Sequence, residues 1–210
     1  DESIAGKGFY TNLNFYYDNF SIAAEYKYYD NYTFSSSDNS IIYNTPPSVR
    51  KDYTYILLNR HPSSLDQNNE TGFQFDVNYV FDDRFELNAN YSQTKSLTNK
   101  SYYQRANSLN LEQSKTFEEV YGQLIAKWND KLNNTFAFNY NLEATSNTKN
   151  YSPIVETKYY MDDINSFKVV VEHQFTKNQV TFEEYYSDLL LVEYLRSPKY
   201  SISGVIEMQT

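Results

Sequence analysis

The chain has 210 residues, a formal net charge of −9, two histidines and no cysteine. These properties exclude disulfides and cysteine-ligated metals, and the acidic charge argues against nucleic-acid binding. Aromatic residues make up 18% of the chain, with 23 Tyr and 14 Phe, whereas soluble cores rest mainly on Leu, Ile and Val. No apolar run approaches the roughly 20 residues of a membrane-spanning helix.

The first predicted element is a hairpin over Gly8–Tyr17 and Phe20–Asn31, with a tight turn at Asp18-Asn19. Apolar and polar residues alternate along both segments, which is the period of a β-strand. The second strand places Ile22 on one face and Glu25 and Lys27 on the other. Each strand therefore has one apolar and one polar face.

Residues 32–70 follow as a long loop, and loops of this length are usually functional or mobile. The loop contains Pro46-Pro47 and an apolar stretch that needs cover from water. Its candidates for contacting a ligand are Tyr53, Tyr55, Arg60 and His61. The alternative is that the loop packs on itself or into the mouth of a barrel.

The clearest alternation lies in Thr71–Thr94, which predicts two strands joined at Asp82-Asp83. Phe and Tyr dominate one face, whereas the other carries polar groups that include Asp76 and Glu86. Aromatic alternation over about ten residues, bounded by a polar turn, is typical of a transmembrane β-hairpin.

Further strands are predicted to bring the total to about nine. They cover Phe117–Trp128, Asn133–Ala144, Phe167–Phe175, Gln179–Leu190 and Tyr200–Gln209. Long outer loops are expected at about residues 32–70, 95–116, 145–166 and 191–199, and the third includes an extended piece at Val155–Met161. Tight turns near residues 18, 83, 130 and 177 are expected at the opposite end. Short turns at one end and long loops at the other are typical of outer-membrane barrels.

Two places disagree with this pattern. His173 falls on an apolar face, and the adjacent Glu183 and Glu184 require a β-bulge to restore the alternation. Elsewhere the apolar faces of the first six strands carry no charged residue except at the strand ends. A soluble sheet also keeps charge off its core face, but Tyr and Trp near strand ends favour a membrane interface.

The sequence therefore predicts an all-β, antiparallel, up-and-down transmembrane β-barrel in the bacterial outer membrane. An odd strand number and a C-terminal segment without an aromatic residue lead us to expect a fragment of a larger barrel. The alternative is a soluble or surface-exposed β-sandwich that binds glycan or protein.

The first half of the chain also resembles a known group of proteins. Gly6-Lys7-Gly8-Phe9-Tyr10, Tyr53-Thr54-Tyr55 and Asn59-Arg60-His61 carry the likeness. It is to an uncharacterised Gram-negative outer-membrane β-barrel family of Bacteroidota-type bacteria, and more distantly to porins and TonB-dependent receptor barrels. The resemblance implies an outer-membrane location with lipid bilayer and lipopolysaccharide as surroundings, and it implies no ligand or catalytic residue.

A barrel directs the polar faces of its strands into the lumen. The lumen-facing candidates are Glu25, Lys27, Asp76, Glu86, Glu119, Lys127, Glu143, Lys168 and Glu172. Because acids outnumber bases in this set, an open lumen favours cations or small polar solutes. The alternative is a closed lumen in which these groups pair with one another.

No catalytic fingerprint occurs, and the adjacent acids Glu118 and Glu119 point to opposite faces of a strand. We therefore expect a non-catalytic channel or transport-related protein without a cofactor or a metal.

Overall fold

The computed structural model describes residues 6–30, 32, 47–60, 68–97, 116–143 and 146–210. They contain one short 3-10 helix, η1 (Leu58–Arg60), and ten strands. The strands are β1 (Lys7–Tyr17), β2 (Phe20–Asp30), β3 (Glu70–Val80), β4 (Phe85–Ser96), β5 (Thr116–Asn129), β6 (Leu132–Glu143), β7 (Thr148–Tyr160), β8 (Asn165–Asn178), β9 (Glu184–Arg196) and β10 (Tyr200–Gln209). Each strand pairs with the next one in the chain, so the all-β, antiparallel, up-and-down prediction is confirmed.

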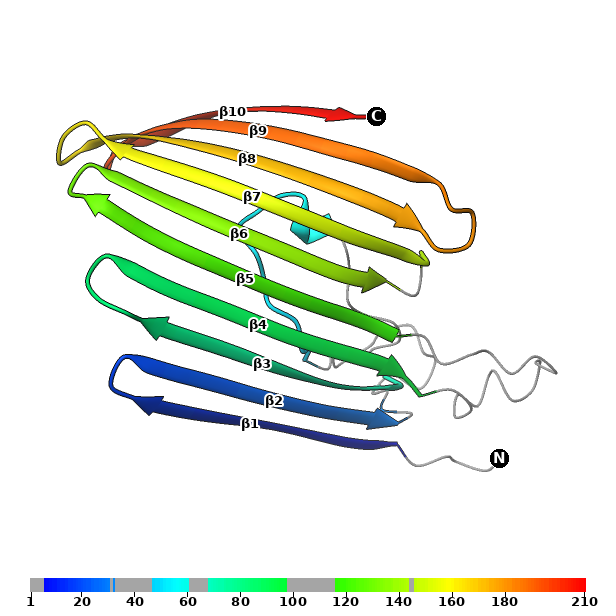
Figure 1. The fold of residues 1–210 in the computed structure, drawn as a ribbon. Helices are drawn as coiled ribbons and strands as arrows, with labels where there is room; N and C mark the ends of the chain where they lie inside the picture. Colours follow the sequence, from blue (N-terminus) through cyan, green and yellow to red (C-terminus); the bar gives the residue numbers. More distant parts are fainter. Residues whose placement is uncertain (1–5, 31, 33–46, 61–67, 98–115, 144–145) are drawn as a thin grey trace.

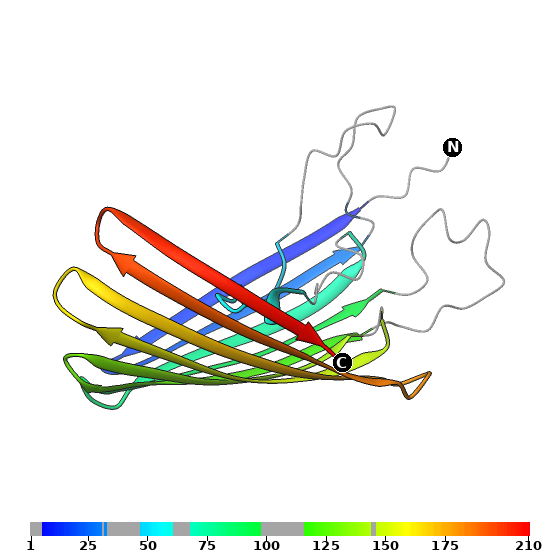
Figure 2. The ribbon, with the colours of Figure 1, turned by 90° about the horizontal axis from the view of Figure 1, so that it is seen from above.

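The sheet is curved into a trough, with β1 and β10 along its two rims (Figure 2). Within the described residues β1 pairs only with β2, and β10 pairs only with β9. The ten strands are therefore not closed into a barrel.

The strand count and the long loop expected at residues 145–166 were wrong, because Thr148–Tyr160 form β7. Pro153 obscures this strand in the sequence, since proline cannot donate to a β-ladder. The pairing of β7 with β8 accordingly skips from Tyr151 to Ile154.

The additional strand also changes the end at which later turns lie. The turn expected at Thr176–Asn178 is formed by residues 179–183, and it lies at the end of the sheet where β2 ends and β3 begins (Figure 1). We call this the loop end, and we call the end with the turns at residues 18–19, 81–84, 130–131, 161–164 and 197–199 the turn end. Glu183 belongs to the turn before β9, so no bulge is needed, and the loop expected at 191–199 shrinks to residues 197–199.

A repeated side-chain device forms several of the tight turns. Asp82 Oδ1 accepts hydrogen bonds from the amides of Arg84 (2.8 Å) and Phe85 (2.9 Å). Asn129, Asp162 and Asn178 accept equivalent bonds from the amides two and three residues ahead. Short Asx side chains favour turns because they satisfy these amides locally.

The two faces of the sheet differ in chemistry. The convex face carries large apolar side chains that remain accessible, including Phe75, Phe136, Phe138 and Val171, each 42% to 49% exposed. The concave face carries charged and amide side chains that are almost fully buried, among them Lys27, Glu119 and Asn139. This distribution is the reverse of that in a soluble sheet, which buries its apolar face.

The inner segment, residues 47–60, lies within the trough (Figure 2). Val49, Leu57 and Leu58 are fully buried there. Part of the segment joins an apolar cluster with concave residues of the sheet: Tyr53, Tyr55, Leu58, Tyr121, Ala137, Ile154 and Val170. The apolar stretch of the long loop is thus covered by the polar face of the sheet.

Candidate functional site on the concave face

Cross-strand pairing places the lumen-facing candidates on the concave face. The set is Glu25, Lys27, Asp76, Glu86, Glu119, Lys127, Glu143, Lys168 and Glu172. Several of them hold the inner segment, which the sequence did not show.

The inner segment crosses the concave face from β2 to β10 through contacts with successive strands. On the β2 and β3 side, Lys27 Nζ donates to Pro47 O at 3.4 Å and pairs with Glu70. Lys51 Nζ then pairs with Asp76 Oδ2 at 2.6 Å. At the far rim, Arg60 pairs with Glu207 on β10. Ionic contacts therefore anchor both ends of the segment.

Arg50 makes the central contact with β5. Its Nε lies 3.2 Å from Glu119 Oε2, and its Nη2 donates to Leu58 O at 2.8 Å. The guanidinium also lies over the rings of Tyr53 and Phe117, at 5.7 and 5.5 Å from their centroids. Because Glu119 is fully buried, this arginine supplies most of the compensation for its charge.

Glu172 on β8 holds the segment by a different interaction. Its two carboxylate oxygens accept hydrogen bonds from the amides of Ile56 (2.9 Å) and Leu57 (2.8 Å). A carboxylate that accepts hydrogen bonds from two backbone amides stabilises an irregular segment in a buried setting, because a buried amide without a partner costs free energy.

The loop candidates for ligand contact are packed rather than free. Tyr53 lies against Tyr121, with 4.7 Å between the ring centroids, and burial, together with the nearby Glu119 carboxylate, raises the pKa of Tyr53. Burial also raises the pKa of Tyr55, next to Glu156 and Glu172. The hydrogen bond to Glu207 raises the pKa of Arg60. His61 lies outside the described residues.

A chain of buried side-chain hydrogen bonds leads across the sheet to Glu119. Thr176 donates to Asn150 (2.7 Å), Asn150 to Asn141 (2.6 Å), Asn141 to Asn139 (3.3 Å) and Asn139 to Glu119 (3.0 Å). All these residues are fully buried. Sequence reasoning missed this chain, because its only signal is polar residues on the polar faces of four strands whose pairing was unknown.

Four more of the lumen candidates contact neighbouring side chains. Glu25 accepts from Tyr10 (3.1 Å) and Asn12 (3.0 Å), and Glu86 accepts from Asn78 (2.7 Å) and Asn88 (3.2 Å). Glu143 accepts from Ser146 (2.9 Å), and Lys168 pairs with Glu193 (2.6 Å). Glu25 and Glu86 thus hold negative charge against neutral donors on the concave face.

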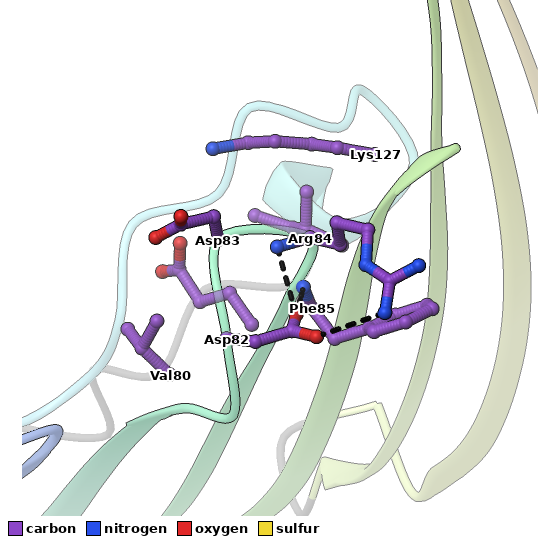
Figure 3. Close-up of a pocket in the computed structure, with 8 residues that line it drawn as sticks. Val80, Asp82, Asp83, Arg84, Phe85 and Lys127 are labelled. Carbon is purple, nitrogen blue, oxygen red and sulfur yellow. Dashed lines mark hydrogen bonds and ion pairs between the residues drawn. The ribbon is translucent and has the colours of Figure 1, made fainter. Parts of the chain in front are cut away.

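A pocket of about 230 Å³ lies at the turn end, next to Lys127 (Figure 3). Its lining residues are Val80, Asp82, Asp83, Arg84, Phe85, Glu86, Ile125 and Lys127. The amide of Arg84 in particular lowers the pKa of Asp82, whose carboxylate is occupied in forming the turn. Asp82 therefore serves the β3–β4 turn, and the pocket lies between this turn and β5.

Two other features of the described residues bear on function. No group of three or more His, Asp or Glu side chains among them is placed to hold a metal ion. No helix in this part of the chain is long and apolar enough to cross a membrane.

Comparison with known proteins identifies the family of this chain. A family described only as a family of unknown function, DUF6029, matches residues 2–209. No curated protein matches the chain.

Proposed function

Because the chain belongs to the DUF6029 family, whose function is unknown, we propose a function from the geometry of the sheet. The ten strands form part of the wall of a bacterial outer-membrane β-barrel, a non-catalytic channel or transport-related protein. The observation that carries this proposal is the reversed distribution of side chains, with apolar groups exposed on the convex face and ionic groups buried on the concave one.

The convex face suits lipid better than water. Its exposed apolar side chains form a continuous surface over neighbouring strands, and soluble proteins rarely expose more than a few hundred Å² of contiguous apolar surface. Apart from the pair His173 and Asp188, its ionisable Asp, Glu, Lys, Arg and His side chains in the described strands lie within three residues of a strand end. These side chains near strand ends are Lys7, Asp30, Lys95, Glu118, Lys149, Lys177, Glu184 and Arg196.

Strand length also fits a bilayer. β6 has 12 residues, so it is about 40 Å long at ~3.4 Å per residue. A tilt of about 40° leaves ~30 Å along the membrane normal, enough for the apolar band of about 25 Å in such barrels.

A barrel in lipid requires partners for both rims of the trough. Unpaired backbone groups on β1 and β10 are not tolerated in hydrocarbon. Because the ten strands alternate in direction, β1 and β10 run antiparallel, so an even number of additional strands completes the wall. The lipid bilayer and lipopolysaccharide then surround the convex face.

The inner segment narrows the lumen and balances much of its charge. Lys51, Arg50 and Arg60 neutralise Asp76, Glu119 and Glu207. Glu25 and Glu86 remain as carboxylates among neutral donors, and such groups favour cations or small polar solutes over anions. The proposed pore is therefore constricted and weakly cation-selective.

The test uses the intact protein from bacterial membranes. We expect extraction only with detergent and a gel mobility that changes on boiling. In planar bilayers under a salt gradient, we expect a reversal potential that indicates cation selectivity. A monodisperse, detergent-free monomer would contradict the membrane location and favour the surface-exposed glycan- or protein-binding alternative. Anion preference would contradict the selectivity alone.

A further inference from the structure

One hydrogen-bonded pair of ionisable side chains lies in the interior of the apolar convex face. His173 on β8 and Asp188 on β9 are directly opposite each other in the antiparallel register. The distance from His173 Nδ1 to Asp188 Oδ1 is 2.6 Å, and the two side chains are 42% and 49% exposed. The imidazole stacks on Tyr186, with 5.7 Å between the ring centroids.

Apolar side chains flank this pair on both sides along the strands. The next convex row toward the loop end is Phe175 opposite Tyr186, and the next row toward the turn end is Val171 opposite Leu190. The other convex charges on these two strands are Lys177, Glu184 and Arg196, at strand ends. The pair is therefore the exception to the charge-free band described above.

An ionisable group that faces hydrocarbon is unfavourable, and such groups usually mark a functional contact. The two side chains satisfy each other through one hydrogen bond, but nearly half of each remains accessible. The remaining donor and acceptor capacity of an imidazole and a carboxylate requires polar groups from outside the sheet. A lipid chain offers none.

We propose that the convex surface around His173 and Asp188 binds a second copy of this chain within the membrane, an inference that rests on the proposed membrane location. Two copies inserted in the same direction are related by a two-fold axis along the bilayer normal. When the convex faces meet across that axis, the lateral order of the two residues is reversed. His173 of each copy then lies opposite Asp188 of the partner subunit, so an imidazole meets a carboxylate on both sides.

The neighbouring apolar side chains support this contact. Val171 and Leu190 are 49% and 39% exposed, and they lie in the row adjacent to the hydrogen-bonded pair. Helices and strands in lipid associate through close packing and interchain hydrogen bonds, since lipid itself is apolar. The surface combines both requirements in one place.

Because the chain contains no cysteine, the contact is tested by single substitutions in the intact protein in native membranes. A short bismaleimide should cross-link V171C into a homodimer; a bifunctional reagent is used because facing sheets lie about 10 Å apart, beyond the Cα separation of about 7 Å that a disulfide can span. The matched control is F138C on β6, which is convex and 47% exposed but lies away from the pair. F138C should give no cross-linked dimer.

Charge variants identify the pair as the cause of association. In detergent, D188N should weaken dimerisation by about tenfold or more, the lower end for close charge pairs across an interface. The exchanged variant H173D/D188H should restore it, since an imidazole and a carboxylate are again present at the two positions.

Membrane fractionation and heat-dependent gel mobility of the same samples separate the two proposals. A membrane-inserted V171C that links no more than F138C overturns the dimer contact alone. Linkage of V171C to a different protein also overturns it. Absence of the protein from the membrane fraction overturns the proposed function, and the dimer contact with it.

Discussion

Replacing Arg50 by methionine tests whether ion pairs hold the inner segment on the concave face. In R50M the fully buried Glu119 keeps the hydrogen bond from Asn139 but loses its only cationic partner in the described contacts. Breaking a buried pair by removing one partner costs about 3–5 kcal/mol. Methionine retains much of the packing against Phe117, so the charge is the main change.

Release of the inner segment can be measured by limited digestion with trypsin under native conditions. Lys51 and Arg60 remain as cleavage sites in R50M. When release and rebinding of the inner segment are fast relative to cleavage, the cleavage rate follows the equilibrium between the bound and released segment. A loss of 3 kcal/mol therefore predicts cleavage about a hundredfold faster than in the wild type.

Two further variants provide the controls. R50M/E119Q removes the uncompensated carboxylate as well, and it should return to within about tenfold of the wild-type rate, because replacing a buried pair by neutral groups is often nearly neutral. K168M breaks the half-exposed Lys168–Glu193 pair, which joins β8 to β9, and should change the rate by less than about fivefold. The reasoning fails if R50M is cleaved no faster than K168M.

Two other predictions concern stability. G72A should destabilise the protein by about 1–3 kcal/mol, because an added Cβ would lie 2.8 Å from Val49 Cγ2 and 2.9 Å from Gln93 O. The matched control is G122A, whose added Cβ meets no atom within 4 Å. Equal unfolding midpoints of the two variants in urea titrations would refute the close approach of the inner segment to β3. Asp82 has a lowered pKa because of the Arg84 amide, so its stabilising contribution is present above about pH 4 and is lost as the pH falls through its folded-state pKa. In that range the unfolding midpoint of D82N should depend less on pH than that of the wild type. An unchanged pH profile would contradict this assignment.

The sequence predicted the hairpins with regular alternation and recognisable turn residues. Thr71–Thr94 is the clearest case, since its strands and the turn at Asp82 correspond to β3 and β4. β7 was missed because Pro153 and polar residues interrupt its pattern, and that omission placed the turn after β8 at the wrong end. Strand number and strand direction thus depend on the least regular segment.

The candidate site was less accessible to sequence reasoning. Alternation placed Glu119 and Glu172 on the polar face, but it could not show that their partners, Arg50 and the amides of Ile56 and Leu57, come from a distant irregular segment. The same limit applies to the Asn139–Asn141–Asn150 chain, because these contacts require the register of β6 against β7. Long-range partners follow from the fold and not from local pattern.

The central claim is that the convex face lies against lipid, and site-directed spin labelling of β6 tests it most directly. Single labels at Phe136 and Phe138, on the convex face, are compared with one at Asp130 in the exposed turn before the strand. In reconstituted membranes of the intact protein, we predict that the labels at Phe136 and Phe138 collide mainly with oxygen dissolved in the bilayer, whereas the label at Asp130 collides mainly with a water-soluble nickel chelate. Collision of all three labels with the chelate to the same extent would contradict the claim.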